Sequence, residues 1–163
     1  MMHHRARRNT ANPMTILRRS VVAVVAVVSI AVLGACTPEQ VLAIAAERGI
    51  TLTHDQAAAV SLRYRAQTPA GAREVGAALV EAEGWPARQF DCLNSLWGDH
   101  ESGWDWSADN PKSSAYGIPQ ALPGSKMASH GKDWRTNGYV QITWGLDYIK
   151  DRYGTPCGAL AAR

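Results

Sequence analysis

The sequence is poor in phenylalanine and cysteine, with one and three among its 163 residues, and it lacks a long apolar run. Its most apolar stretch, residues 20–33, is 14 residues long. A membrane-spanning helix needs about 20 such residues, so the stretch does not predict one. No histidine or cysteine stands at metal-ligand spacing from another. We therefore predict no metal site and no bound cofactor.

The first 35 residues also lack aspartate and glutamate, although they contain five arginines. A basic start followed by a short apolar stretch is typical of a secretory signal peptide. The stretch ends at Leu33-Gly34-Ala35-Cys36, which resembles the lipobox of bacterial lipoproteins, where the cysteine is acylated and becomes the new N-terminus. We expect residues 1–35 to be removed and a lipid on Cys36 to anchor the protein to the outer face of the cytoplasmic membrane, at the cell wall. In the alternative, an ordinary signal peptide is cut nearby, Cys36 is incidental and the protein is secreted.

The basic character of the chain comes from this leader. Without residues 1–35, 12 lysines and arginines face 14 acidic residues, a net charge of −2. No stripe of basic residues follows, so the charge pattern does not favour nucleic acid as a partner.

Three cysteines leave one unpaired in an exported protein. If Cys36 carries lipid, Cys92 and Cys157 remain as a pair that closes a loop of 65 residues. On the chain-entropy model such a disulfide stabilises the fold by about 4 kcal/mol. In the alternative, both residues are buried thiols.

Aromatic residues divide the remaining chain into two parts. All six tryptophans lie between residues 85 and 144, whereas residues 37–84 contain one aromatic residue, Tyr64, and many alanines. Threonines at positions 37, 53 and 68 begin three predicted helices, two with proline in the first helical position. We interpret residues 36–69 as a helical spacer and residues 70–163 as the main domain, which we expect to be monomeric.

The main domain is predicted to be mainly α, in the order helix, long irregular segment, helix. The first helix runs from about Ala87 to His100 and ends at a glycine. Residues 104–136 contain three prolines and three glycines, which exclude a long helix. The second helix begins at Asn137 and ends at Tyr153. At most a small β-hairpin is expected.

Glu101 is set apart from the other acidic residues by its position at the end of the first helix. At helical spacing Phe90, Leu93 and Trp97 form an apolar stripe, and Glu101 continues it. Asp99 lies on the opposite, solvent-facing side. Partial desolvation of a carboxyl group raises its pKa, which lets glutamic acid donate a proton near neutral pH. The pattern therefore predicts a general acid.

From Glu101 onward the chain carries an ordered series of motifs: ESGW (101–104), NPKSSAYGIPQALPGSKM (110–127), DWRTN (133–137) and QITWGLDYI (141–149). This succession resembles the transglycosylase-like domain of actinobacterial cell-wall proteins. That domain is related to soluble lytic transglycosylases, resuscitation-promoting factors and the C-terminal domain of aggregation-promoting factors. The resemblance covers about residues 70–158. It implies a lysozyme-like fold that cleaves peptidoglycan between N-acetylmuramic acid and N-acetylglucosamine.

The resemblance also implies roles for individual residues. Glu101 would be the catalytic acid, Ser102 would hydrogen-bond near its carboxyl group and Gln120 would line the sugar cleft. Asn137 and Tyr148 match an asparagine and a tyrosine of the family. The predicted glycan-binding residues are Ser102, Trp104, Tyr116, Gln120, Asn137 and Tyr148.

Some of these residues have structural alternatives. Trp97 and Trp144 are expected in the core. Tryptophans 104, 106 and 134 and Tyr116 are assigned equally to the core or to sugar stacking. Asn137 is first a helix cap and only second a ligand.

The implied reaction needs one carboxylate. The substrate's own C6 hydroxyl attacks the anomeric carbon and a 1,6-anhydro product forms. If Asp105 or Asp109 supplied a second carboxylate, the enzyme would be a hydrolytic muramidase. The remaining alternative is a non-catalytic lipoprotein that binds the cell wall or promotes aggregation.

Overall fold

The computed structural model describes residues 37–163, so the predicted signal peptide and the lipid-bearing Cys36 lie outside the described residues. The described chain is mainly helical, as predicted. None of its helices is both long and apolar enough to cross a membrane. Its elements are α2 (Pro38–Glu47), α3 (His54–Arg65), α4 (Pro69–Ala82), α5 (Arg88–Asn94), the π-helix η1 (Ser95–Glu101), the 3-10 helices η2 (Gly124–Ser129) and η3 (Trp134–Thr136), α6 (Gly138–Tyr153) and α7 (Pro156–Ala161).

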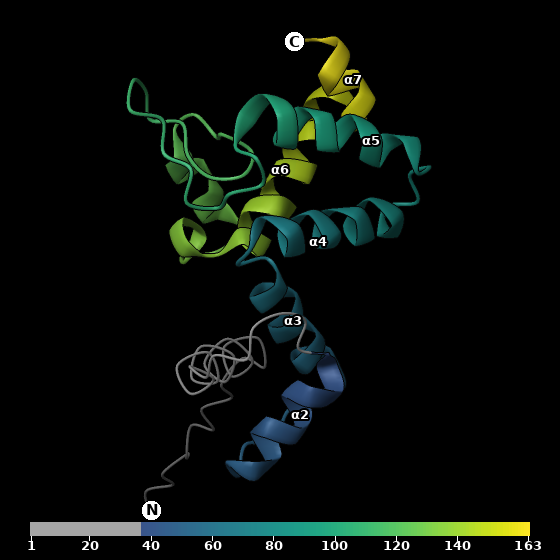
Figure 1. Cartoon of the computed structure of the whole chain (residues 1–163), viewed down its shortest axis with the longest axis vertical. Coiled ribbons are helices and arrows are strands. Elements are labelled where there is room, and N and C mark those ends of the chain that lie inside the picture. The colour runs from purple at the N-terminus through teal and green to yellow at the C-terminus, as the bar shows by residue number, and fades with distance from the viewer. Residues whose placement is uncertain (1–36) are drawn as a thin grey trace, which may run out of the picture.

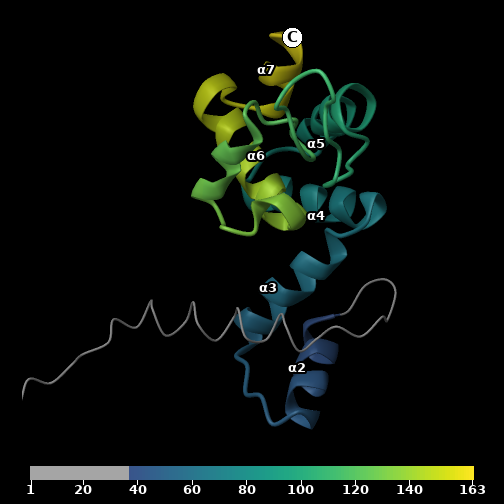
Figure 2. The same cartoon turned by 90° about the vertical axis from the view of Figure 1, so that its left-hand side faces the viewer.

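Helices α2 and α3 form an arm that projects from the rest of the molecule (Figures 1 and 2). Thr37 and Thr53 begin them with complete capping boxes, as their sequence predicts. The two helices enclose a small apolar cluster of their own around Val41, Ala57 and Val60. The arm therefore has its own local core.

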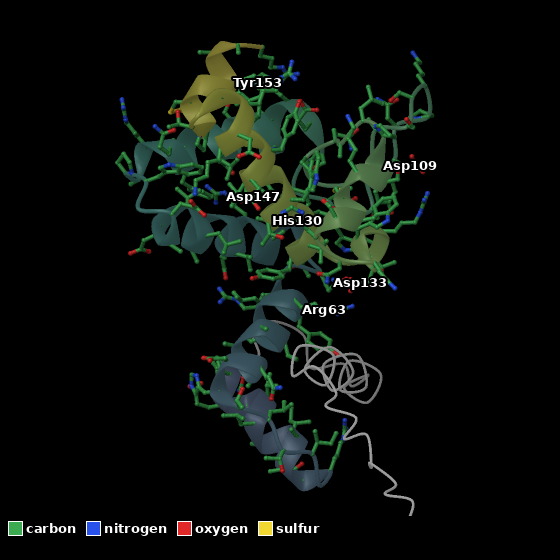
Figure 3. The ribbon with its side chains drawn as sticks, turned by 180° about the vertical axis from the view of Figure 1, so that it is seen from behind. Arg63, Asp109, His130, Asp133, Asp147 and Tyr153 are labelled. Atoms are coloured by element: carbon green, nitrogen blue, oxygen red, sulfur yellow. A yellow bond between two sulfur atoms is a disulfide. The ribbon has the colours of Figure 1, made fainter. Side chains whose placement is uncertain are left out.

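The end of the arm is fastened to the main domain by polar contacts. Arg63 forms an ion pair with Asp133, at 2.5 Å between Nη2 and Oδ2, and both lie at the junction in Figure 3. The side-chain amide of Gln67 donates to the carbonyl of Thr136 at 3.2 Å, and the backbone carbonyl of Gln67 accepts from the indole of Trp106 at 3.1 Å. The end of α3 and the turn that follows it thus contact the irregular segment before α6.

In the main domain, α4 and α5 lie one above the other, with α6 beside both (Figure 2). Their facing sides supply one apolar core, which includes Val75, Leu93, Trp97, Ile142 and Ile149. Ile142, Leu146 and Ile149 form the buried apolar stripe of α6, and the predicted cap of this helix at Asn137 and its end at Tyr153 are confirmed.

Helix α7 was not predicted. The last predicted helix ends at Tyr153, but Thr155 caps a further helix by accepting from the amide of Gly158 at 3.2 Å. The predicted disulfide is confirmed, since Cys92 of α5 and Cys157 of α7 are bonded at 2.06 Å. The bond joins the helix that leads to Glu101 to the last helix described.

Residues 102–136 form the irregular segment that the prolines and glycines predict. Within the described residues, strand pairing is limited to isolated bridges that join Tyr116 to Asp109 and to Ala121. Another apolar cluster joins this segment to α6. It contains Tyr116, Ala121 and Met127, with Trp134 and Trp144 packed beside them. It supports the loop that faces Glu101.

Candidate active site

Glu101 lies at the end of a helix that widens before it stops. Residues 95–101 form a π-helix, which the sequence pattern did not predict. The carbonyl of Trp97 accepts hydrogen bonds from the amides of Ser102, Gly103 and Trp104 at 3.1, 3.0 and 3.4 Å. Because these contacts gather the next three residues on one acceptor, the chain turns away directly after Glu101. Leu93 and Trp97 are buried below it, as predicted.

Trp104 belongs to the core, and its predicted role in glycan binding is wrong. Its side chain is 3% exposed and meets Trp97 edge to face at 5.2 Å between ring centroids. The indole nitrogen donates to Asn94 at 3.1 Å. A ring covered on both faces cannot stack on a sugar. Trp104 instead fixes the end of the helix that carries Glu101.

Glu101 borders a hollow that is open to solvent. The hollow has a volume of about 360 Å³, which lies within the range of ligand sites. Apart from Glu101 its lining comes from the irregular segment: Ala108, Asp109, Asn110, Pro111, Lys112 and Gln120. Figure 3 places Asp109 on the loop side of the domain, away from the arm. The fold thus brings the predicted acid and the predicted cleft residue Gln120 to one concave surface.

Opposing influences act on the ionisation of Glu101. Burial raises the pKa of Glu101, while the charges of Arg163 and of protonated His100 act in the opposite direction. The net direction is upward, as the sequence predicts. The side chain is nevertheless exposed at the rim of the hollow, so its carboxyl group is accessible to a ligand.

Ser102 and Gln120 fix the backbone around the hollow. The hydroxyl of Ser102 donates to the carbonyl of Ile118 at 2.8 Å, so its hydrogen bond goes to the facing loop. The side-chain amide of Gln120 donates to the carbonyls of Gly117 and Ala108 at 2.9 and 3.3 Å. Both residues hold the loop, and Gln120 also lines the hollow.

Tyr116 and Asn137 have structural roles, which contradicts their predicted place in glycan binding. Tyr116 is 9% exposed, and its hydroxyl donates to the backbone carbonyl of Arg135 at 3.0 Å. The guanidinium of Arg135 covers the ring of Tyr116. Asn137 is 3% exposed, caps α6 and donates to Asp133 at 3.0 Å. Neither side chain lines the hollow.

Tyr148 is exposed but lies outside the residues that line the hollow. Its ring stacks on Trp144 at 5.2 Å with an angle of 14° between the planes. It is 40% exposed, whereas Trp144 is half-buried, so the pair offers one aromatic face to solvent. Its contact with a sugar stays a prediction.

The two candidate second carboxylates differ in position. Asp105 accepts hydrogen bonds from the amide and hydroxyl of Ser107 at 2.8 and 2.7 Å and does not line the hollow. Asp109 lines it together with Glu101. Of the pair, only Asp109 therefore shares the hollow with the acid.

Sequence reasoning missed two features of the site. Lys112 brings a positive charge to the lining of the hollow. Gln141 is fully buried and binds the loop at the amide of Ile118. Gln141 interrupts the apolar stripe of α6, between Gly138 and Gly145, which was the signal that could have identified it. Among residues 37–163, no group of three potential metal ligands lies together.

No model of a known family matches the chain, and neither a curated protein nor a solved structure matches it.

Proposed function

We propose that this protein is a peptidoglycan lytic transglycosylase with a lysozyme-like domain over residues 70–163. The observation that carries the proposal is Glu101, a partly desolvated acid with a raised pKa at the rim of an open hollow. The series of motifs around it supports the choice of glycan as substrate. The predicted leader and Cys36 support action outside the cell, on a strand near the membrane.

In the proposed reaction, protonated Glu101 donates its proton to the oxygen of the bond between N-acetylmuramic acid and N-acetylglucosamine. That bond breaks as positive charge develops at the anomeric carbon. The C6 hydroxyl of the same muramic acid then attacks this carbon, and the Glu101 carboxylate accepts the hydroxyl proton. The products are a 1,6-anhydro sugar and a free 4-hydroxyl, and Glu101 returns to its protonated form without a second carboxylate.

Asp109 supports a second candidate, a hydrolytic muramidase on the same fold. A carboxylate across the scissile bond from the acid could activate a water molecule or act as nucleophile. Asp109 lines the same hollow as Glu101 and is exposed, so it meets the positional requirement better than Asp105.

The mass of the products tests both candidates. Purified peptidoglycan is digested with wild type and with Asp109→Asn, and the muropeptides are analysed by mass spectrometry. The transglycosylase predicts anhydro-muramic ends, lighter than reducing ends by one water, from both proteins. Asp105→Asn is the matched control for the charge change. Reducing ends from wild type, lost in Asp109→Asn, would support the muramidase, and release of no muropeptide would contradict both enzymes and favour a wall-binding protein.

A further inference from the structure

Gln141 on α6 is a buried polar residue with every side-chain group in use. It is 0% exposed. Its carbonyl oxygen accepts from the amide of Ile118 at 2.9 Å, and its nitrogen donates to the carbonyls of Trp106 and Trp134 at 3.0 and 2.9 Å. One side chain therefore joins α6 to three separate parts of the irregular segment.

Both backbone polar groups of Ile118 are held by side chains. Gln141 binds its amide, and the hydroxyl of Ser102 donates to its carbonyl at 2.8 Å. Ser102 directly follows Glu101, and Gln120 is two residues beyond Ile118. The hydrogen bonds thus connect α6 through the backbone of Ile118 to Ser102, the neighbour of Glu101. Gln120 follows in the same loop.

The backbone comes unusually close to Gln141 at this point. Gly117 has a φ of +74°, and a Cβ atom added there would lie 2.4 Å from the Gln141 carbonyl oxygen. Only glycine provides this backbone conformation without strain and leaves room for the amide. The local sequence is therefore adapted to the presence of the Gln141 side chain behind the loop.

We propose that Gln141 is a positioning residue for Glu101, which holds the loop of Gln120 and the acid in a fixed relation through the backbone of Ile118. It does not touch the substrate. The inference rests on the proposed glycan cleavage. When Gln141 is removed, the loop loosens, the substrate is misplaced relative to Glu101, and the partial desolvation of the carboxyl group decreases.

The test compares Gln141→Met with Gln89→Met. Gln89 is also a buried glutamine, 4% exposed, but its carbonyl accepts from the amide of Cys157 at 2.9 Å, next to the disulfide. Both variants lose hydrogen bonds of a buried amide, and only Gln141 is connected to the hollow. Each is assayed on purified peptidoglycan below its own melting temperature, with circular dichroism as the check of folding.

We expect kcat of Gln141→Met to fall by about 10²-fold with a smaller change in KM, because misplacement by about 1 Å costs that much. The basic limb of its pH–rate profile should move to lower pH, since hydration of Glu101 lowers its pKa. Gln89→Met should keep the wild-type kcat and limb. The fold-loss in kcat of the double variant Ser102→Ala/Gln141→Met should be smaller than the product of the two separate losses, because both side chains hold the backbone of one residue, Ile118.

The inference would be overturned if Gln141→Met had the same kcat and the same basic limb as Gln89→Met. It would also be overturned if the losses in kcat of Gln141→Met and Ser102→Ala multiplied in the double variant. If Gln141→Met does not fold, Gln141→Asn keeps the amide but is one methylene too short to reach all three partners. A wild-type kcat in that variant would equally overturn it. An inactive wild type, or an active Glu101→Gln, would instead contradict the proposed function itself.

Discussion

At the scale of the residue, the environment of Glu101 separates it from the other acids of the chain. Asp99, two positions earlier on the same helix, does not line the hollow, whereas Glu101 does. Glu101 is partly desolvated against the loop, and this desolvation is the largest influence on its pKa. Desolvation thus moves the titration of Glu101 to higher pH and widens the pH range in which it can donate a proton.

The raised pKa leads to a prediction about pH dependence. Only protonated Glu101 can donate, so activity is present below its pKa and is lost as the pH rises through it. The basic limb of kcat/KM should therefore lie above 4.5, the ordinary value for glutamate. Arg163→Ala removes a positive charge that lowers the pKa, so it should move this limb to higher pH.

Arg152→Ala serves as the control for that prediction, because Arg152 lies over the ring of Tyr153 and does not act on Glu101. Rates measured across a pH series for the three proteins provide the comparison. A limb at or below 4.5, or identical limbs in the two arginine variants, would contradict the assigned electrostatics.

At the scale of the element, the end of the α5–η1 helix is fixed by close packing against α4. A Cβ atom added at Gly76 of α4 would lie 2.6 Å from the Trp104 ring, and Trp104 in turn packs on Trp97. Trp104 also has a φ of +63°, which is uncommon for a residue other than glycine. Helix α4 therefore supports the turn that follows Glu101.

Gly76→Ala should destabilise the protein by about 1–3 kcal/mol, because overpacking a tight contact costs more than the helix propensity gained. Urea denaturation of wild type and variant measures the difference, with the same dependence of unfolding free energy on urea concentration used for both. Helix propensity alone predicts the opposite sign, since alanine is favoured over glycine inside a helix by about 1 kcal/mol. Unchanged or increased stability would thus show that the contact has room to relax.

The elements also show what the sequence could and could not predict. Threonine caps identified α2, α3 and α4 because a cap is a local signal, and Glu101 stood out because helical spacing aligned it with Trp97. Helix α7 has the same threonine and proline start, but its six residues are too few for a periodic pattern. Trp104 and Gln141 could not be placed, because contacts distant in sequence decide burial within an irregular segment.

At the scale of the whole molecule, one covalent bond and one polar junction connect the parts. The disulfide joins α5 to α7, and the contacts of Arg63 and Gln67 join the arm to the segment before α6. Asp109, which lines the hollow, lies on the loop side of the domain, whereas the arm leaves from the junction at Arg63 and Asp133 (Figure 3). The arm therefore leaves the hollow uncovered.

The double variant Cys92→Ser/Cys157→Ser should lose about 4 kcal/mol of unfolding free energy, because the bond closes a loop of 65 residues. Guanidinium denaturation with and without reductant measures this loss. Reduced wild type should match the variant, and the variant should not respond to reductant. Equal stability of oxidised and reduced wild type would contradict the stabilising role of the bond.

The most direct measurement is the rate at which wild type, Glu101→Gln and Asp99→Asn release soluble muropeptides from purified peptidoglycan. Each variant removes one carboxylate from the same helix and keeps its shape. General acid catalysis contributes about 10²–10⁴-fold, so Glu101→Gln should lose at least about 10²-fold of the rate while Asp99→Asn keeps it. Equal rates in Glu101→Gln and wild type would contradict a proton donor at position 101.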